Sequence, residues 1–397
     1  MACEPHDEIR TALHEHLVRW RLRRFTNDSD YFAWQRQCLS STTLTQLNSL
    51  VERRQGGAGH DEIAFYDFSA DDEVLPVLYS QQYAYFEEVG SRVVACIEGV
   101  GRTLDFGCGV GILTTFYASR LPDQEFVGID RSPTSIRAAR RMAEMLGLKN
   151  VRFECADGIP ESFGPSYGAV LSTHVLLQAE QDPGVPSVTW RTFARSRDGG
   201  QQGEFERRTG LVTRLDQVVA ILEQGGHMVV CEKTRQLARR IPFQRALAAR
   251  GLQVIRTPEL IRYQLVAETV DDGPFFVMRK NGEPWLAGDE LPEPEGEPPF
   301  DRSRGRTRHG HPDDPLYESH QPSAQTTWEG LEDREVIEEY DSQGPEGRQV
   351  HIELGRSGLL GYLYCANTFD QRQIVIVEWS RLSILQAYYR EIRNGLI

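Results

Sequence analysis

The order of apolar and polar positions changes at about residue 102, where short apolar runs begin to alternate with amphipathic stretches. The stretches between the runs have helical spacing, and the clearest opens with Ser132 as an N-cap, has Pro133 at the first helical position and ends at Gly147. Strands that alternate with helices predict an α/β fold with a mostly parallel sheet covered by helices on both faces. The later runs QVIRT and PFFVMRK are expected to close the sheet as an antiparallel edge. The five runs with the length and composition of buried strands are TLDF, EFVGID, VRFECAD, GAVLST and HMVVCE.

The segments on either side of this region have different patterns. Residues 1–80 have helical apolar spacing, as in IRTALHEHLVRW and LTQLNSLVERR, and predict an N-terminal helical region and lid. Residues 81–280 hold the alternating pattern. Residues 281–325 are rich in Pro, Gly and charge and predict a linker, because such a composition buries little surface. Residues 326–397 contain four strand-like runs and a closing amphipathic helix, which predict a small, separate α+β module.

Composition narrows the class of protein. The 397-residue chain has 44 Lys and Arg against 58 Asp and Glu, a net charge of −14, which disfavours nucleic acid as the main partner because phosphate binding relies on clustered basic side chains. The N-terminal MACEPHDEIR lacks the apolar core of a signal peptide, and no apolar run reaches the ~20 residues that span a bilayer. The seven cysteines form no Cys-x-x-Cys pair, and His309 and His311 in the linker lack further ligands. We therefore expect a cytoplasmic protein without a metal site or membrane contact.

The stretch TLDFGCGVG is the most informative motif. Gly107, Gly109 and Gly111 follow a predicted strand at the carboxyl edge of the sheet, where α/β proteins bind ligands. Glycine leaves the backbone open to close approach by a ligand. The dinucleotide pattern G-x-G-x-x-G is absent, because Ile112 or Thr114 occupies the place of the third glycine, and the chain has no phosphate loop. A ligand with a pyrophosphate is therefore disfavoured.

The remaining pattern, D-x-G-x-G-x-G, resembles motif I of the class I S-adenosylmethionine-dependent methyltransferases, a family with a Rossmann-like fold. The resemblance covers roughly residues 80–280. It implies that the glycine loop receives the amino-acid end of S-adenosylmethionine and that Asp105 receives its ammonium group. It also implies that Asp130, at the end of EFVGID, binds the ribose hydroxyls and that Asp157, in VRFECADG, contacts the adenine amino group. Ser172, in GAVLSTHVLLQ, matches the strand end that faces the methyl donor.

The chain departs from the pattern of this family at several positions. Gly168 stands where the fourth strand usually begins after an Asp, and Gln224 replaces the proline of the common PGG strand entry. Members that methylate amino groups of nucleic acids usually carry [DN]-P-P-[YFW] after the fourth strand, whereas this chain has STHV. Together with the acidic charge, this favours an O, N, C or S atom of a small molecule or a protein side chain as the methyl acceptor.

Three side chains are candidates for the catalytic, acceptor side of the site. His174, after the fourth predicted strand, has the chemistry of a general base. Glu232, at the end of the fifth, can line an acceptor pocket, and Tyr83 belongs to an aromatic stretch suited to acceptor recognition. Each of them has a structural alternative, because such residues also pack or hydrogen-bond locally. The long polar loop with Trp190 and Phe193 is predicted to be a lid or binding loop of the acceptor pocket.

Two functions remain open from the sequence. One is a methyltransferase whose C-terminal module binds a partner or forms a homodimer, and the other is a non-catalytic S-adenosylmethionine-binding sensor or scaffold. A nicotinamide-dependent dehydrogenase is disfavoured by the missing third glycine. Turnover of the cofactor distinguishes the two functions that remain.

Overall fold

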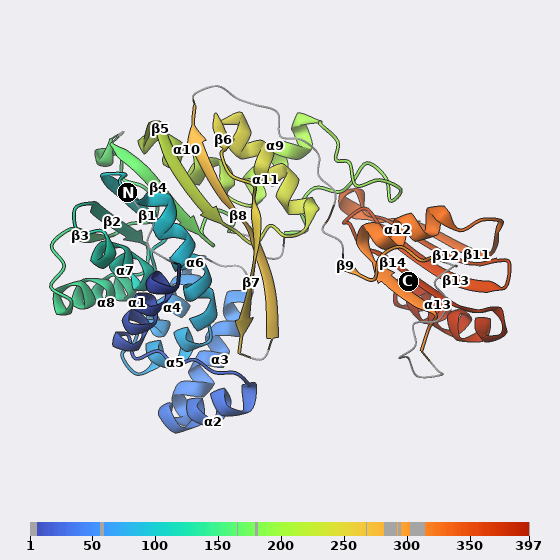
Figure 1. Ribbon diagram of the computed structural model, residues 1–397, viewed down its shortest axis with the longest axis horizontal. Helices are drawn as coiled ribbons and strands as arrows, with labels where there is room; N and C mark the ends of the chain where they lie inside the picture. The colour runs from blue at the N-terminus through green and yellow to red at the C-terminus, as the bar shows by residue number, and fades with distance from the viewer. Residues whose placement is uncertain are drawn as a thin grey trace. The chain divides into compact units, whose positions relative to one another are not determined.

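Two β-sheets organise the chain in the computed structural model (Figure 1). The structure describes residues 6–55, 59–164, 166–178, 182–266, 268–281, 292, 295–301 and 314–396. The chain divides into two units, and each contains one of the sheets. Unit 1 comprises Met1–Gln181, Glu206–Arg235 and Ala246–Leu286, and unit 2 comprises Asp182–Phe205, Gln236–Arg245 and Ala287–Ile397.

The sheet of unit 1 contains the five predicted parallel strands, in the order β3-β2-β1-β4-β5. Their antiparallel neighbour β8 also pairs with β6 and β7, so the predicted α/β fold and its antiparallel edge are confirmed. The strand order reverses between β1 and β4, and open α/β sheets bind ligands at that point. The strands are β1 (Arg102–Phe106), β2 (Glu125–Asp130), β3 (Val151–Cys155), β4 (Tyr167–Thr173), β5 (Leu222–Cys231), β6 (Leu252–Val254), β7 (Glu259–Leu265) and β8 (Glu268–Lys280).

Helices precede the sheet and connect its strands. α8 begins as predicted, because the Ser132 hydroxyl accepts a hydrogen bond from the Ser135 amide at 3.0 Å. Helices α9 (Gly199–Arg208) and α11 (Leu237–Ala249) include residues of both units. The helices of unit 1 are α1 (His6–Arg19), α2 (Asp28–Cys38), α3 (Ser41–Gln55), α4 (Gly59–Ser69), α5 (Val74–Ser80), α6 (Tyr83–Ile97), α7 (Ile112–Arg120), α8 (Pro133–Met145) and α10 (Leu211–Ile221), with a 3₁₀ turn, η1 (Glu161–Phe163).

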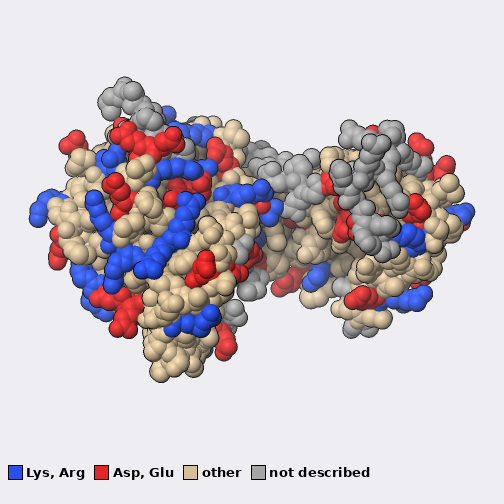
Figure 2. Space-filling view, turned by 60° about the horizontal axis from the view of Figure 1, so that its bottom comes forward, with Lys and Arg blue, Asp and Glu red and all other residues tan. Residues whose placement is uncertain are grey.

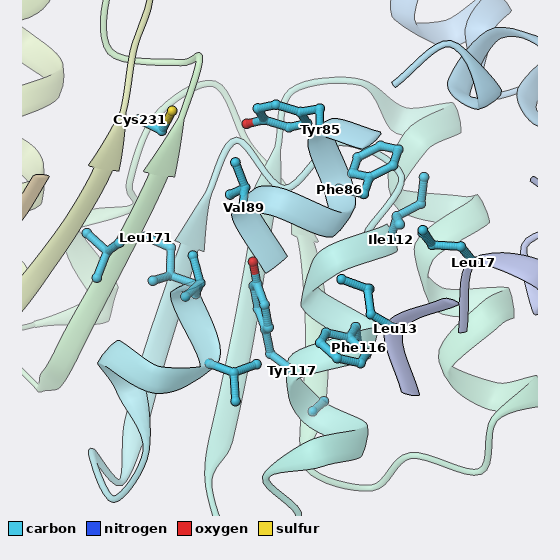
Figure 3. Close-up of a cluster of buried hydrophobic side chains, with 14 of the residues drawn as sticks. Leu13, Leu17, Tyr85, Phe86, Val89, Ile112, Phe116, Tyr117, Leu171 and Cys231 are labelled. Atoms are coloured by element: carbon cyan, nitrogen blue, oxygen red, sulfur yellow. The ribbon is translucent and has the colours of Figure 1, made fainter. Parts of the chain in front are cut away.

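The core of unit 1 joins the N-terminal helices to the sheet. Figure 3 shows Leu13 of α1 beside Phe116 of α7, and Leu171 of β4 belongs to the same buried cluster. The buried His16 ring of α1 lies 2.8 Å from the carbonyl oxygen of Ile112, the first residue of α7. Because α7 begins directly after the glycine loop, α1 supports the position of that loop.

Unit 2 is built on an antiparallel sheet in the order β11-β12-β13-β14-β10-β9. The four predicted strands and the closing helix are present. The composition of residues 317–325 predicts part of a linker, but Tyr317 is buried and pairs with Ile376, so β10 and α12 belong to the sheet unit. A four-residue strand is too short to show a reliable alternation of apolar positions. The elements are β9 (Glu295–Gly296), β10 (Tyr317–His320), α12 (Gln321–Gly330), β11 (Arg334–Gln343), η3 (Pro345–Gly347), β12 (Gln349–Ser357), β13 (Leu360–Asn367), β14 (Arg372–Glu378), η4 (Trp379–Arg381) and α13 (Leu382–Leu396).

The long loop after β4 contributes to the core of unit 2, contrary to the prediction that it lines an acceptor pocket. Trp190 stacks on His351 with ring centroids 3.7 Å apart, and Phe193 packs against Leu237 and Ile241. Both side chains are less than 10% exposed. The polar composition of the loop concealed this, because its few aromatic residues are the ones that anchor it.

Candidate functional site

The candidate site lies at the carboxyl ends of β1, β2 and β4, in unit 1. Gly107, Gly109 and Gly111 all have positive φ, at +79°, +54° and +79°. An added Cβ at Gly107 would lie 2.6 Å from a methyl group of Val175, and at Gly111 it would lie 2.8 Å from Ala139. These two glycines permit close packing.

Gly109 differs from its two neighbours. An added Cβ there meets no heavy atom of the described chain within 4 Å. Its amide donates a hydrogen bond to Oδ2 of Asp130 at 3.0 Å, which fixes the loop against the end of β2. The backbone at Gly109 is therefore positioned by Asp130 and open on the side where a side chain would project.

Asp105 is buried at the end of β1. Its side chain is 6% exposed, and Oδ2 accepts a hydrogen bond from the Thr114 hydroxyl at 2.5 Å. Burial is the main cause that raises the pKa of Asp105 to about 6; the Thr114 hydrogen bond opposes the rise and nearby Asp130 adds to it. A carboxylate that is costly to ionise is stabilised by a cation beside it. Asp105 therefore suits a ligand ammonium group.

The raised pKa of Asp105 predicts a pH-dependent stability. An unfolded Asp titrates near about 3.9, so between that pH and about 6 the folded protein binds more protons than the unfolded chain. This stabilising contribution is complete below about pH 4 and is lost as the pH rises through about 6. Asp105→Asn should therefore be more stable than the wild type at pH 7, by about 1–3 kcal/mol.

Urea denaturation of wild type and Asp105→Asn at pH 4 and pH 7 checks this expectation. Subtracting the two free energies of unfolding at each pH removes the contribution of the other carboxyl groups. A difference that is the same at both pH values would contradict the assignment to Asp105.

Asp130 ends β2 with both carboxylate oxygens engaged by the backbone. Oδ2 accepts a hydrogen bond from the Gly109 amide, and Oδ1 accepts one from the Ser132 amide at 2.8 Å. Burial, the largest influence, raises the pKa of Asp130 despite these two hydrogen bonds. Each carboxylate oxygen retains a free lone pair, so the group can accept two more hydrogen bonds.

The N-terminal helices approach Asp130, which the sequence did not predict in detail. Asp67 of α4 accepts hydrogen bonds from the Ser132 hydroxyl at 2.6 Å and from the Thr134 amide at 3.1 Å. Burial raises the pKa of Tyr79 of α5, and the negative charges of nearby groups, Asp130 among them, raise it further. Residues of α4 and α5 therefore lie near the end of β2, as a lid over this edge would require.

Asp157 and Ser172 occupy different environments. Asp157 follows β3 and is exposed, and its negative charge acts on the Arg214 guanidinium. Ser172 at the end of β4 is buried, and its Oγ has no hydrogen-bond partner among the described residues. A buried hydroxyl without a partner is costly, so Ser172 is suited to a ligand that supplies one.

His174 makes a close contact with Asp272 that the sequence alone did not reveal. Its Nε2 lies 2.7 Å from Oδ2 of Asp272, and its ring stacks on Tyr85 with centroids 5.1 Å apart. Asp272 is 3% exposed and also accepts from the Tyr263 hydroxyl at 3.2 Å. Although burial, the largest influence, raises the pKa of Asp272, the His174 hydrogen bond and the other favourable interactions hold it below its usual range. Asp272 therefore stays ionised beside the imidazole.

The antiparallel direction of β8 explains how Asp272 reaches His174. Cys231 of β5 pairs with Thr173 of β4 on one side and with Phe275 of β8 on the other. Residues before Phe275 therefore extend past the carboxyl edge, on the level of the residues that follow Thr173. His174 also has φ of +56°, a conformation that costs a non-glycine residue about 1–3 kcal/mol and that occurs often at functional sites.

Glu232 and Tyr83 have partners other than a ligand. Glu232 is buried, and its Oε1 accepts from the amides of Val175 and Leu176, both at 2.8 Å, so it holds the segment that follows His174. The Tyr83 hydroxyl is 2.6 Å from Nδ1 of His14, in α1. Catalytic roles for these two residues stay predictions. The contacts favour a supporting role for Glu232.

Figure 2 shows a connected band of basic side chains across the visible face of unit 1, with groups of acidic side chains around it. Some basic side chains of unit 1 have acidic partners, such as Arg24 with Glu87 at 3.3 Å and Arg92 with Glu88 at 2.6 Å. Across the described ranges, no helix combines the length and apolarity needed to cross a membrane.

Comparison with known proteins gives matches to parts of the chain. Residues 98–182 match the protein-family model described as a methyltransferase domain. The release factor glutamine methyltransferase of Escherichia coli K12 is 30% identical over 134 residues, which is 32% of this chain and 43% of that protein. The tRNA (guanine-N(7)-)-methyltransferase of Rubrobacter xylanophilus is 43% identical over 54 residues, which is 14% of this chain and 24% of that protein. The chain thus spans less than half the length of these curated relatives.

A solved structure is also similar to part of this chain. The N-methyltransferase NodS of Bradyrhizobium japonicum, in complex with S-adenosyl-L-homocysteine, is 17% identical to this chain. The alignment covers 49% of this chain and 87% of that chain, with a TM-score of 0.33.

Proposed function

In its central region this chain belongs to the class I S-adenosylmethionine-dependent methyltransferase family, and we propose that it transfers the methyl group of S-adenosylmethionine to a nucleophilic atom of an acceptor. The observation that carries the proposal is the open backbone at Gly109, which lies between the buried Asp105 and the half-buried Asp130 at the point where strand order reverses. A ligand with an ammonium group and a diol, but no pyrophosphate, fits this arrangement.

The residues at this edge fit the cofactor by their chemistry. Asp105 would pair with the ammonium group, and Asp130 would use its free lone pairs to accept from the two ribose hydroxyls. The exposed Asp157 would accept from the adenine amino group, and the buried Ser172 hydroxyl lacks a partner within the described chain. S-adenosylmethionine supplies an activated methyl group, so the protein mainly has to align the acceptor and exclude water.

The His174–Asp272 pair is suited to remove a proton from the acceptor. Because Asp272 faces Nε2 at 2.7 Å, it holds a proton on that nitrogen and leaves Nδ1 as the basic atom. Glu232 fixes the following segment through the Val175 and Leu176 amides and so supports the position of His174. The pair is useful for an acceptor that keeps its proton until attack, such as a hydroxyl, an amide or a protonated amine.

We propose a small molecule or a protein side chain as the acceptor. The curated relatives act, by their names, on a release factor glutamine and on a tRNA guanine, but this chain has Ser-Thr-His-Val where an Asn-Pro-Pro or Asp-Pro-Pro signature would follow β4. Its net charge of −14 also disfavours nucleic acid.

A glycine pair tests where the cofactor lies. Gly109→Ala should weaken S-adenosylmethionine binding by about tenfold or more, because the backbone is strained by about 1–2 kcal/mol and the methyl group projects into the open side of the loop. Gly111→Ala has the same sign of φ, but its methyl group would contact Ala139 at 2.8 Å. It should therefore lower the melting temperature more than Gly109→Ala does. Calorimetric titration with S-adenosylmethionine and thermal unfolding of both variants check this expectation. If the loss of affinity were in the same proportion to the loss of melting temperature in both variants, the expectation would be contradicted.

Conversion of S-adenosylmethionine to S-adenosyl-L-homocysteine, with a fractionated cell extract as the source of acceptors, tests the activity. Turnover that depends on both protein and extract supports a methyltransferase. Tight binding of the cofactor without turnover in any fraction would instead favour the sensor or scaffold.

A further inference from the structure

The pairing of β11 with β12 gathers four titratable side chains on one face of the sheet of unit 2. Asp341 lies opposite His351 and Glu339 lies opposite Glu353 in the antiparallel register. Since alternate residues of a strand share a face, all four side chains project to the same side. This cluster is separate from the residues proposed for methyl transfer.

The atoms of this cluster have the separations of metal ligands. Nδ1 of His351 is 3.0 Å from Oδ1 of Asp341 and 3.7 Å from Oε1 of Glu339, and the three ligand atoms lie within 4.8 Å of one another. Ligands bound to a zinc ion at about 2.0–2.2 Å in a tetrahedron are about 3.3–3.6 Å apart. Only small movements of the two exposed acids would be needed to close on an ion.

The imidazole of His351 is held in one orientation. Its side chain is 1% exposed. Its ring stacks parallel to the Trp190 ring, with the centroids 3.7 Å apart and an angle of 2° between the ring planes. Nε2 faces Oε2 of Glu353 at 3.5 Å, and Glu353 is itself fixed by hydrogen bonds from the Trp328 indole at 3.1 Å and the Tyr362 hydroxyl at 2.5 Å. A carboxylate on the far nitrogen is the usual support of a metal-binding histidine, because it keeps the proton there and leaves the near nitrogen as a ligand.

The charges of the cluster also favour a divalent ion. Glu339, Asp341 and Glu353 surround one imidazole, and neither Glu339 nor Asp341 has a Lys or Arg partner within 4 Å in the described part of the chain. If the neutral ring carries its proton on Nε2, the Nδ1 lone pair faces the Asp341 carboxylate at 3.0 Å, and a cation between them would remove this repulsion; a proton on Nδ1 would instead be donated to Asp341. An imidazolium would relieve the repulsion but would neutralise only one of the three carboxylates.

We propose that Glu339, Asp341 and His351 bind a divalent transition-metal ion of the zinc type, with Glu353 as the residue that orients the imidazole. An imidazole ligand selects such ions over Mg²⁺ and Ca²⁺, which prefer oxygen ligands alone. Because β11 is an edge strand of its sheet, the ion would fasten this strand to β12. The absence of Cys-x-x-Cys pairs has no bearing on such a site.

Titration of the full chain with Zn²⁺ by calorimetry tests the proposal, with His309 and His311 replaced by Gln in every protein so that they contribute no binding. Asp341→Asn should abolish one equivalent of Zn²⁺ binding, and Asp341 is exposed enough for the variant to fold. Glu353→Gln should weaken the same equivalent by about 10–100-fold. Glu338→Gln is the matched control, because Glu338 lies opposite Leu354, on the other face of β11.

The fluorescence of Trp190 provides a second readout. Co²⁺, a substitute for Zn²⁺ that quenches nearby indoles, should quench the wild type and Glu338→Gln but not Asp341→Asn, because Trp190 stacks on the ligand ring. Identical Zn²⁺ titrations of wild type and Asp341→Asn would overturn the proposal, and His351 would then be an imidazolium held by carboxylates. Mg²⁺ binding as tight as that of Zn²⁺ would also overturn it.

Discussion

Replacing Asp130 with alanine is expected to weaken S-adenosylmethionine binding by about 100-fold or more, because hydrogen bonds to a charged acceptor contribute about 1.5–3 kcal/mol each. The proposed contacts are the two ribose hydroxyls. The substitution also removes the acceptor of the Gly109 amide, which is 3.0 Å from Oδ2, and so loosens the glycine loop. Isothermal titration of wild type and variant with S-adenosylmethionine measures the effect.

Two further variants separate the ligand contact from the loop. Asp130→Asn keeps the shape and one acceptor oxygen, so its affinity should lie between those of wild type and Asp130→Ala. Asp123→Asn changes an exposed acid just before β2, at the opposite edge of the sheet, and should bind like wild type. Binding by Asp130→Ala as tight as that of wild type would contradict the assignment of the ribose contact. Failure of the wild type to bind would remove the proposed function itself.

Replacing His174 with glutamine is expected to lower turnover by about 10²–10⁴-fold, the usual contribution of a general base, while cofactor affinity stays within about twofold because the proposed cofactor contacts are made by other residues. The measurement is S-adenosyl-L-homocysteine formation with one fixed acceptor fraction, together with the binding titration. His227→Gln is the control, since His227 is a half-buried histidine at the opposite end of the sheet, level with Ala169.

Asp272→Asn tests whether Asp272 acts through His174. An Asn facing Nε2 no longer holds the proton there, so the pH profile of turnover should change its form as well as its height. If the two residues act as a unit, the double variant should lose little more than His174→Gln alone. If the losses of turnover in the two single variants multiplied in the double variant, the two residues would act independently. A pH profile unchanged by Asp272→Asn would also contradict the hypothesis that Asp272 acts through His174. Full activity of His174→Gln would indicate an acceptor that is already deprotonated.

Local patterns identified much of the fold. The five apolar runs became β1 to β5, and the Ser132 cap, the antiparallel β8 and the helix of residues 382–396 lie where the sequence predicts them. The reason is that burial of alternate or periodic apolar positions is decided within one element. The position of Asp105, Gly109 and Asp130 at one edge also followed from sequence, because carboxyl ends of neighbouring parallel strands meet.

Other features depended on contacts between distant segments. Residues 317–330 form a short strand and a helix whose burial depends on the sheet beside them, and the polar loop containing Trp190 belongs to the core of unit 2. In neither segment does a regular pattern of apolar residues extend far enough to predict which element the segment packs against. The contact of α4 with the start of α8 through Asp67 depends likewise on tertiary packing.

The sequence by itself determined the glycine loop, its flanking acids and the fold class, because each of these depends on spacing within one segment or on the rule that parallel strands end together. Only the tertiary structure decided that Asp272 meets His174 and that Asp341 and Glu339 meet His351. Those meetings follow from the register of antiparallel pairs, β8 beside β5 and β11 beside β12. The register of two paired strands is fixed by which side chains are buried across the whole sheet. It therefore cannot be predicted from one segment of the sequence alone.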